Sequence, residues 1–134
     1  MGKVIINVGW NGNYSASPEN KDICVVVTGN TLDEVKKNMM QSLCAHIDAM
    51  KKDGEIIPPE FKGEFDFEFH LNVRAILHFT DGIITKTALA KETGINVKQL
   101  THYASGWRNP RPETSKKIFD GIKQISQKLI SVSL

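Results

Sequence analysis

Apolar and polar positions follow two different periods along the chain, and together they predict an α+β protein. Residues 4–8, 14–17 and 23–28 are short apolar or β-branched runs separated by turn residues. Such runs are typical of strands, and their close spacing favours an antiparallel meander. Residues 65–71 alternate strictly between apolar and polar side chains. This period of two predicts a fourth, half-buried strand. Its acidic face either faces water or takes part in oligomer or partner contacts.

A helical period lies between the third and the fourth predicted strand. Thr31 and Glu34 stand in capping-box register, and Gly54 is a typical helix stop. The pattern predicts a helix over residues 32–53 whose apolar stripe packs against the sheet. The stripe consists of Leu32, Val35, Met39, Leu43, Ile47 and Met50.

The chain beyond residue 71 is helical in pattern throughout. We expect a short helix over residues 73–79, followed by a pair of helices over 86–93 and 97–105. Pro112 suits the first turn of a last helix. The apolar stripe of this last helix consists of Ile118, Phe119, Ile122, Ile125 and Leu129.

Composition and length narrow the class of protein. The chain has 134 residues, of which 40% are hydrophobic and 24% charged. This balance is globular, and the length suits one domain or two small units, which excludes a large multidomain enzyme. No apolar run approaches the length of a membrane span, and the N-terminus does not resemble a signal peptide. Cys24 and Cys44 are expected to be small core residues. We therefore expect a cytoplasmic protein without membrane contact.

Charge is distributed unevenly along the chain. Residues 1–70 carry seven lysines, no arginine and eleven acidic residues, a net charge of −4. Residues 71–134 carry ten lysines and arginines and four acidic residues, a net charge of +6. This change predicts two parts that divide at residue 70. The basic part suits a polyanion such as DNA, and the acidic part suits a basic protein partner.

Residues 85–106 have the spacing of a helix-turn-helix. Ala90 supplies a small residue for the helix crossing, and Gly94 suits a tight turn. The side chains expected to hold both helices on one core are Leu89, Ile95, Leu100 and Tyr103. The second helix would then present its N-terminal residues to the DNA major groove.

The stretch that closes this motif, residues 103–112, resembles the Xre/Cro-type phage-repressor motif. The resemblance implies a phosphate contact at Thr85, Lys86 and Thr87, where a helix N-terminus favours an anion. It also implies that base edges are contacted by Val97, Lys98, Thr101 and His102. Gln99 either caps its helix or contacts adenine. The implied DNA-backbone clamps are Arg108 and Arg111, and Trp107 is expected to be a packing residue.

The first half of the chain resembles the N-terminal domain of HicB antitoxins. The resemblance rests on Tyr14-Ser15-Ala16-Ser17-Pro18, on Gly29-Asn30-Thr31-Leu32-Asp33-Glu34-Val35, on Asn38 and on Gly54-Glu55-Ile56-Ile57-Pro58. Together with the second half it covers nearly the whole chain. It implies a degenerate, partial RNase H-like β-β-β-α-β domain over residues 1–70, before a helix-turn-helix domain over 71–134.

The resemblance also implies a function. HicB antitoxins of type II toxin–antitoxin systems neutralise HicA, a small mRNA-cleaving toxin, and repress their own operon, usually as oligomers. The expected partners are thus operator DNA, a HicA-like toxin and further copies of the chain. Residues 19–24 depart from the Leu-Pro-Gly-Cys-like run that the family often has. The alternative is therefore a stand-alone phage-type regulator whose N-terminal part serves oligomerisation or other protein contacts. A pure protein-interaction scaffold is a third class.

An enzyme is not expected. An RNase H nuclease needs several carboxylates around two Mg²⁺ ions, but the strand over residues 4–8 has no acid. No histidine has a GxSxG serine or a paired reactive cysteine as a partner. Cys24 and Cys44 lack zinc-ligand spacing. The sequence thus predicts no catalytic residue, no metal site and no cofactor.

Overall fold

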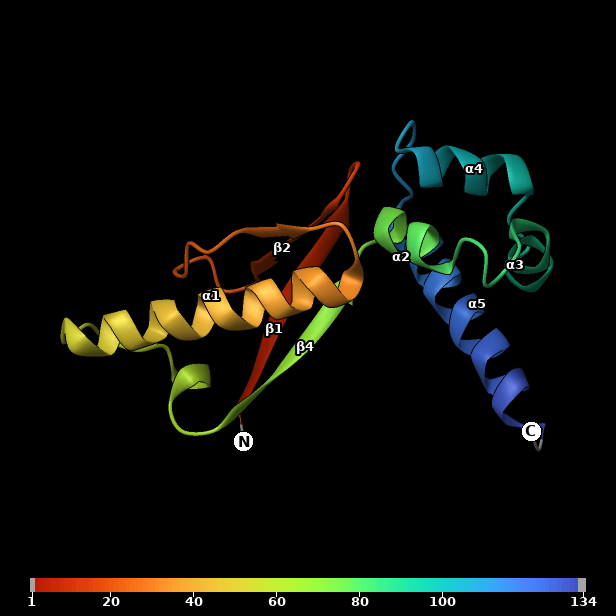
Figure 1. The fold of residues 1–134 in the computed structure, drawn as a ribbon. Coiled ribbons are helices and arrows are strands. Elements are labelled where there is room, and N and C mark those ends of the chain that lie inside the picture. Colours follow the sequence, from red (N-terminus) through yellow and green to blue (C-terminus); the bar gives the residue numbers. More distant parts are fainter. Residues whose placement is uncertain (1, 133–134) are drawn as a thin grey trace. The chain divides into compact units, whose positions relative to one another are not determined.

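A computed structural model describes residues 2–132 of the chain. It is an α+β structure with a four-stranded mixed sheet and five α-helices among the described residues (Figure 1). The chain forms two compact units, Met1–Asn72 and Val73–Leu134. The units divide two residues beyond the position predicted from the charge change, and each unit is described by itself below.

The sheet of the first unit contains a meander and one parallel strand. Strands β1 (Gly2–Trp10), β2 (Tyr14–Pro18) and β3 (Val27–Gly29) pair in sequence, and both pairings are antiparallel, as predicted. Strand β4 (Phe65–Leu71) pairs with β1 in parallel. The strand order is β3-β2-β1-β4, so β4 lies at an edge of the sheet.

Strand β3 is shorter than the predicted strand over residues 23–28. Its pairing with β2 ends at Ala16 opposite Val27. Continued pairing would bring Pro18 into the ladder, and proline has no N–H to donate. Residues 24–26 therefore belong to no strand, and Val26 is 73% exposed.

Helix α1 (Leu32–Lys52) confirms the predicted helix and its N-cap. The Thr31 hydroxyl accepts a hydrogen bond from the Glu34 backbone N–H at 3.1 Å. Gly54 follows the helix with a φ of +70°, which favours glycine. The helix packs on β2 and β3. Its buried residues are Val35, Met39, Leu43 and Ile47, all four from the predicted stripe.

Two further features concern the residues before and within this part of the chain: a short 3-10 helix, which was not predicted, and the two cysteines. The 3-10 helix η1 (Pro59–Phe61) follows the connector and buries Phe61 completely. Cys24 and Cys44 are both exposed free thiols, so their prediction as core residues is wrong. Cys24 lies in the segment that does not pair with β2, and Cys44 lies beside the buried stripe of α1 rather than on it.

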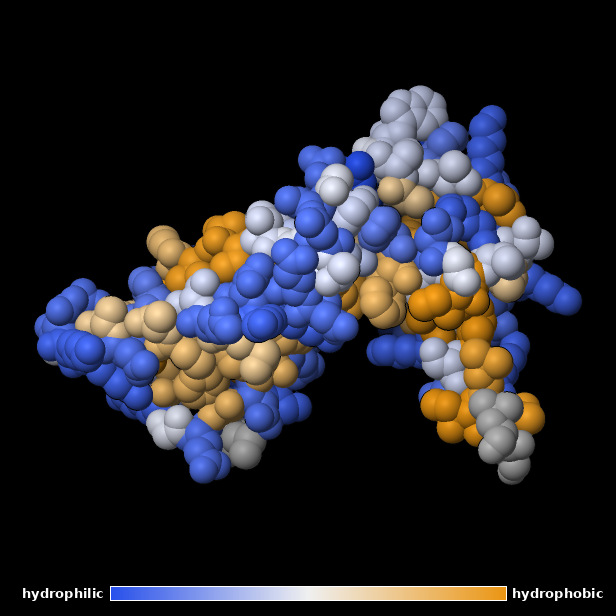
Figure 2. All heavy atoms as spheres, in the orientation of Figure 1, coloured by the Kyte–Doolittle hydropathy of each residue, from blue (hydrophilic) through white to orange (hydrophobic). Residues whose placement is uncertain are grey.

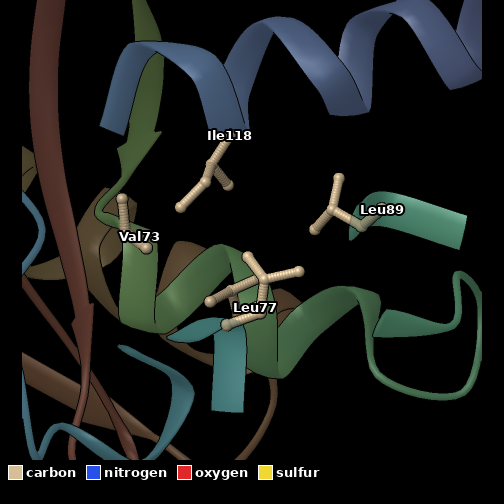
Figure 3. Close-up of a cluster of buried hydrophobic side chains, with 5 residues drawn as sticks. Val73, Leu77, Leu89 and Ile118 are labelled. Carbon is tan, nitrogen blue, oxygen red and sulfur yellow. The ribbon is translucent and has the colours of Figure 1, made fainter. Parts of the chain in front are cut away.

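The second unit consists of four helices around one small core. These are α2 (Val73–Thr80), α3 (Lys86–Thr93), α4 (Val97–Ser105) and α5 (Pro112–Ile130). Pro112 occupies the first turn of α5, as predicted. Each helix contributes to the buried cluster, four members of which are labelled in Figure 3. The cluster consists of Val73, Leu77, Leu89, Leu100 and Ile118.

Hydrophilic side chains cover much of the visible surface along α1, whereas hydrophobic side chains gather toward the C-terminal end of α5 (Figure 2). Among residues 2–132, no helix combines the length and the apolar character that a membrane crossing requires.

Candidate nucleic-acid interface

Helix α3 and the turn after it are held by local hydrogen bonds. The Thr85 hydroxyl caps α3 by accepting from the Ala88 N–H at 3.0 Å. Gly94 ends the helix with a φ of +77°, and its N–H donates to the Ala90 carbonyl at 2.8 Å. The Thr93 hydroxyl donates to the Leu89 carbonyl and accepts from the Ile95 N–H. These bonds fix the turn that leads into α4.

Helix α4 is capped at both ends. The Asn96 side-chain oxygen accepts from the Gln99 N–H at 2.8 Å. Gly106 ends the helix with a φ of +78°, and its N–H donates to the Tyr103 carbonyl. The Arg74 guanidinium lies so close to Gly106 that a Cβ there would stand 2.6 Å from it. A cation at a helix C-terminus is favourable for the helix dipole.

Removal of the Asn96 cap should weaken the second unit measurably. Asn96→Ala deprives the Gln99 N–H of its acceptor, and we expect a loss of about 1 kcal/mol in the free energy of unfolding. Urea unfolding of the full chain, followed by circular dichroism, measures the change. Asn109→Ala, in the exposed loop before α5, is the matched control and should stay close to wild type. Equal stability of both variants would contradict the role of the cap.

Three basic side chains of the predicted interface surround one surface pocket. The pocket has a volume of about 250 Å³ and is lined by Asn96, Lys98, Gln99, His102 and Arg108. Lys98 and His102 are one helical turn apart on α4, so they lie on the same face. Arg108 joins them because the chain turns back after Gly106. The pocket therefore lies open at the surface and offers hydrogen-bond donors to an anion or to the edge of a base.

Trp107 lies beside this pocket and is not a packing residue. Its side chain is 68% exposed, which corrects the sequence prediction. The His102 ring meets the indole edge-on at 4.4 Å between centroids, and the Arg108 guanidinium lies 5.2 Å from the indole centroid. The indole thus holds two of the pocket's basic groups in place. The signal in the sequence was its position directly after a helix-ending glycine, where the chain leaves the core.

Gln99 points inward rather than toward solvent. Its side-chain oxygen is buried, and no hydrogen-bond partner is found for it within residues 2–132. Its backbone N–H is the group that Asn96 caps.

The other predicted DNA-contacting residues lie outside the pocket lining. Thr85, Lys86 and Thr87 form the start of α3, where the Lys86 ammonium is 3.9 Å from the Asp81 carboxylate. Val97 begins α4 and is 40% exposed. The Thr101 hydroxyl donates to the Val97 carbonyl at 2.9 Å. Arg111 precedes α5 and makes no side-chain cap there.

The acidic face of β4 carries a charged cluster in the first unit. The Glu68 carboxylate lies 2.8 Å from His70 Nε2 and 3.7 Å from the Lys3 ammonium. The hydrogen bond to His70, and then the positive charge of Lys3, lower the pKa of Glu68 below its usual value. Glu68 therefore stays ionised at neutral pH on the edge strand of the sheet.

The described residues contain no group of three or more His, Cys, Asp or Glu side chains placed to hold a metal ion. Comparison of the chain with protein-family models, with curated proteins and with solved structures finds no significant match.

Proposed function

We propose that the chain is an antitoxin-type transcriptional repressor. Its second unit binds operator DNA through α3 and α4, which act as a helix-turn-helix, and its first unit neutralises a HicA-like, mRNA-cleaving toxin. The observation that carries the DNA-binding part is the pocket on α4. Lys98, His102 and Arg108 all line this pocket. It lies on the second unit, and residues 71–134 carry a net charge of +6.

The local geometry suits recognition in the major groove. Both ends of α4 are capped, and Leu100 anchors the helix in the core, so its exposed face is presented rigidly. Lys98 can donate to guanine O6 and N7, and the exposed Val97 can contact a thymine methyl group. The first turn of α3 offers backbone N–H groups and Lys86 to a phosphate. Arg108 and Arg111, in the loop before α5 and at its start, supply further phosphate contacts.

The antitoxin part of the proposal rests on the first unit. Its element order, β1-β2-β3-α1-β4 with a 3-10 turn before β4, agrees with the β-β-β-α-β order that the resemblance to HicB implies. Its surface carries the acidic excess of the chain, which suits a basic RNA-binding toxin. The edge strand β4, with Glu68 ionised, belongs to this acidic surface.

Binding to DNA from upstream of the chain's own gene tests the proposed repressor. Fluorescence anisotropy with this DNA and with a scrambled duplex, over a salt series, measures affinity and specificity together. We expect much tighter binding to the upstream DNA and a steep linear fall of log K with log salt, because phosphate contacts release counterions. Equal affinity for both duplexes would contradict sequence-specific repression.

The second candidate is a stand-alone phage-type regulator without a toxin partner. The departure of residues 19–24 from the family's run favours it. In this segment the Asn20 side-chain oxygen accepts from the Asp22 N–H and closes a local turn. The Asn20 side-chain nitrogen donates to the Glu60 carboxylate at 3.2 Å and connects this turn to η1. Co-expression with the short basic protein of a neighbouring gene separates the candidates. An antitoxin rescues growth from that protein, whereas a stand-alone regulator does not.

A further inference from the structure

Trp107 is a large apolar side chain that the fold of the second unit leaves in water. Its indole is 68% exposed, and it belongs neither to the buried cluster nor to the side chains packed against that cluster. Burial of an aromatic side chain of this size is a major source of contact energy, both in cores and at interfaces. The stability of the unit therefore does not account for a tryptophan at this position.

The backbone holds Trp107 in this outward position. Its N–H donates to the His102 carbonyl at 3.1 Å, and the N–H of Arg108 donates to the same carbonyl at 3.4 Å. The Arg74 guanidinium lies against Gly106, the residue before Trp107. These contacts at the end of α4 fix the start of the loop, so the indole is in place before any partner binds. A side chain that is already in place loses little freedom on binding.

Basic side chains border the indole. The His102 ring lies 4.4 Å from it between centroids, and the Arg108 guanidinium lies 5.2 Å from its centroid. Both basic residues line the pocket that Lys98 also lines, and none of the described residues around this pocket is acidic. The surface thus places an apolar ring among groups that attract a negative charge.

This pattern is complementary to the backbone of DNA. Along each strand, negatively charged phosphates alternate with deoxyribose rings, which are uncharged and rich in carbon. Proteins contact both the phosphates and the sugars to fix their position on the duplex. An acidic protein surface offers carboxylates to the basic groups, but no regular apolar partner for the ring between them. The observations therefore favour DNA as the partner of the indole.

We propose that Trp107 is a DNA-contacting residue whose indole packs against a deoxyribose, next to a phosphate that Arg108 contacts. This inference rests on the proposed function, because it places the ring on the same duplex that α4 reads. A contact with a sugar carries no sequence information of its own. Trp107 therefore adds affinity and fixes the position of α4 on the duplex, whereas the reading of bases stays with Lys98 and Val97.

Acrylamide quenching of tryptophan fluorescence tests the contact directly. In a Trp10→Phe chain, Trp107 is the one remaining tryptophan. We expect a saturating amount of the upstream duplex to lower the quenching constant of Trp107 severalfold, because a packed sugar keeps the quencher away from the ring. The control is a Trp107→Phe chain, in which Trp10 alone fluoresces and the duplex should leave quenching unchanged. If Trp107 is as open to acrylamide in the complex as in the free chain, the inference is wrong.

Affinity provides the second readout. Trp107→Ala should raise the dissociation constants of the upstream and the scrambled duplex by a similar factor, about tenfold, and Trp107→Phe should retain most of the affinity. The slope of log K against log salt should stay as in the wild type, because the indole neutralises no phosphate. Arg108→Ala should lower this slope by about one.

Ile130→Ala is the matched control for the loss of an exposed apolar side chain. Ile130 is 80% exposed in the same unit and does not line the pocket, so this variant should bind both duplexes like the wild type. Trp107→Ala binding as tight as that of the wild type would overturn the inference.

The two duplexes separate this inference from the proposed function. Equal affinity for both duplexes, with Trp107 shielded in each complex, overturns the sequence-specific repressor and keeps the contact. Tighter binding of the upstream duplex, with Trp107 still open to acrylamide, keeps the repressor and overturns the contact. A chain that binds neither duplex overturns both.

Discussion

Gly29→Ala is expected to destabilise the first unit by about 2–3 kcal/mol, near the upper end of the cost of overpacking a core. A Cβ at Gly29 would stand 2.6 Å from the Val35 backbone nitrogen and 2.9 Å from the Val35 Cα. These atoms belong to the first turns of α1, so no side-chain rotation relieves the collision. The substitution must move β3 away from α1, or α1 away from the sheet.

Tryptophan fluorescence can report this change for the first unit alone. The chain has two tryptophans, Trp10 in the first unit and Trp107 in the second. Trp10 meets the Tyr14 ring at 5.0 Å between centroids, so its emission depends on the β1–β2 hairpin. Urea unfolding in a Trp107→Phe background therefore follows the unit in which Gly29 lies.

Gly9→Ala is the matched control for this prediction. Gly9 lies in the same sheet, but a Cβ there meets only the Asn72 side-chain nitrogen at 3.3 Å and the Ser15 hydroxyl at 3.8 Å. These side-chain atoms can shift, and we expect a change within about 1 kcal/mol. If both alanine variants unfold at the same urea concentration, the close approach of β3 to α1 is not part of the fold in solution.

The features that the sequence predicted correctly depend on neighbours in the chain. Helix α1 and its Thr31 cap, and α3 and α4 with Gly94 and Gly106 at their ends, follow from side-chain period and capping chemistry. The meander follows from short runs and turn residues. Each of these signals is complete within one segment.

The features that the sequence did not predict depend on residues far apart in the chain. Strand β3 was predicted too long because its length depends on where Pro18 falls opposite it. Cys24 was predicted to be buried for the same reason, since it lies in the part that does not pair. Trp107 differs from these two, because the signal for its exposure, the helix-ending Gly106, lies directly before it in the chain. Periodicity contains none of this information.

The same distinction between local and long-range information applies to the residues of the candidate site. The common face of Lys98 and His102 follows from their spacing on one helix. The position of Arg108 at the same pocket, and the inward position of the Gln99 oxygen, required the folded chain. The approach of Arg74 from α2 to Gly106 has no signal in the sequence either.

The double variant Lys98→Ala with His102→Ala is expected to abolish most of the preference for operator DNA. Each lost base contact costs about 1–3 kcal/mol of discrimination, which corresponds to roughly a 5- to 150-fold loss of affinity. The affinity for scrambled DNA should fall far less, because non-specific binding depends on the total of the phosphate contacts. Anisotropy with both duplexes at one fixed salt concentration measures the ratio of the two affinities. We expect this ratio to fall strongly in the double variant.

Unfolding does not explain such a loss, because the substitutions leave the supports of α4 in place. Asn96 and Gly106 still cap the helix, and Leu100 still anchors it in the core. Lys91→Ala is the control for charge: Lys91 is exposed on α3 and does not line the pocket. We expect Lys91→Ala to lower the affinity for both duplexes slightly and equally. Operator binding by the double variant as tight as that of the wild type would mean that α4 is not the helix that reads the bases, and the specificity would then have to come from other residues.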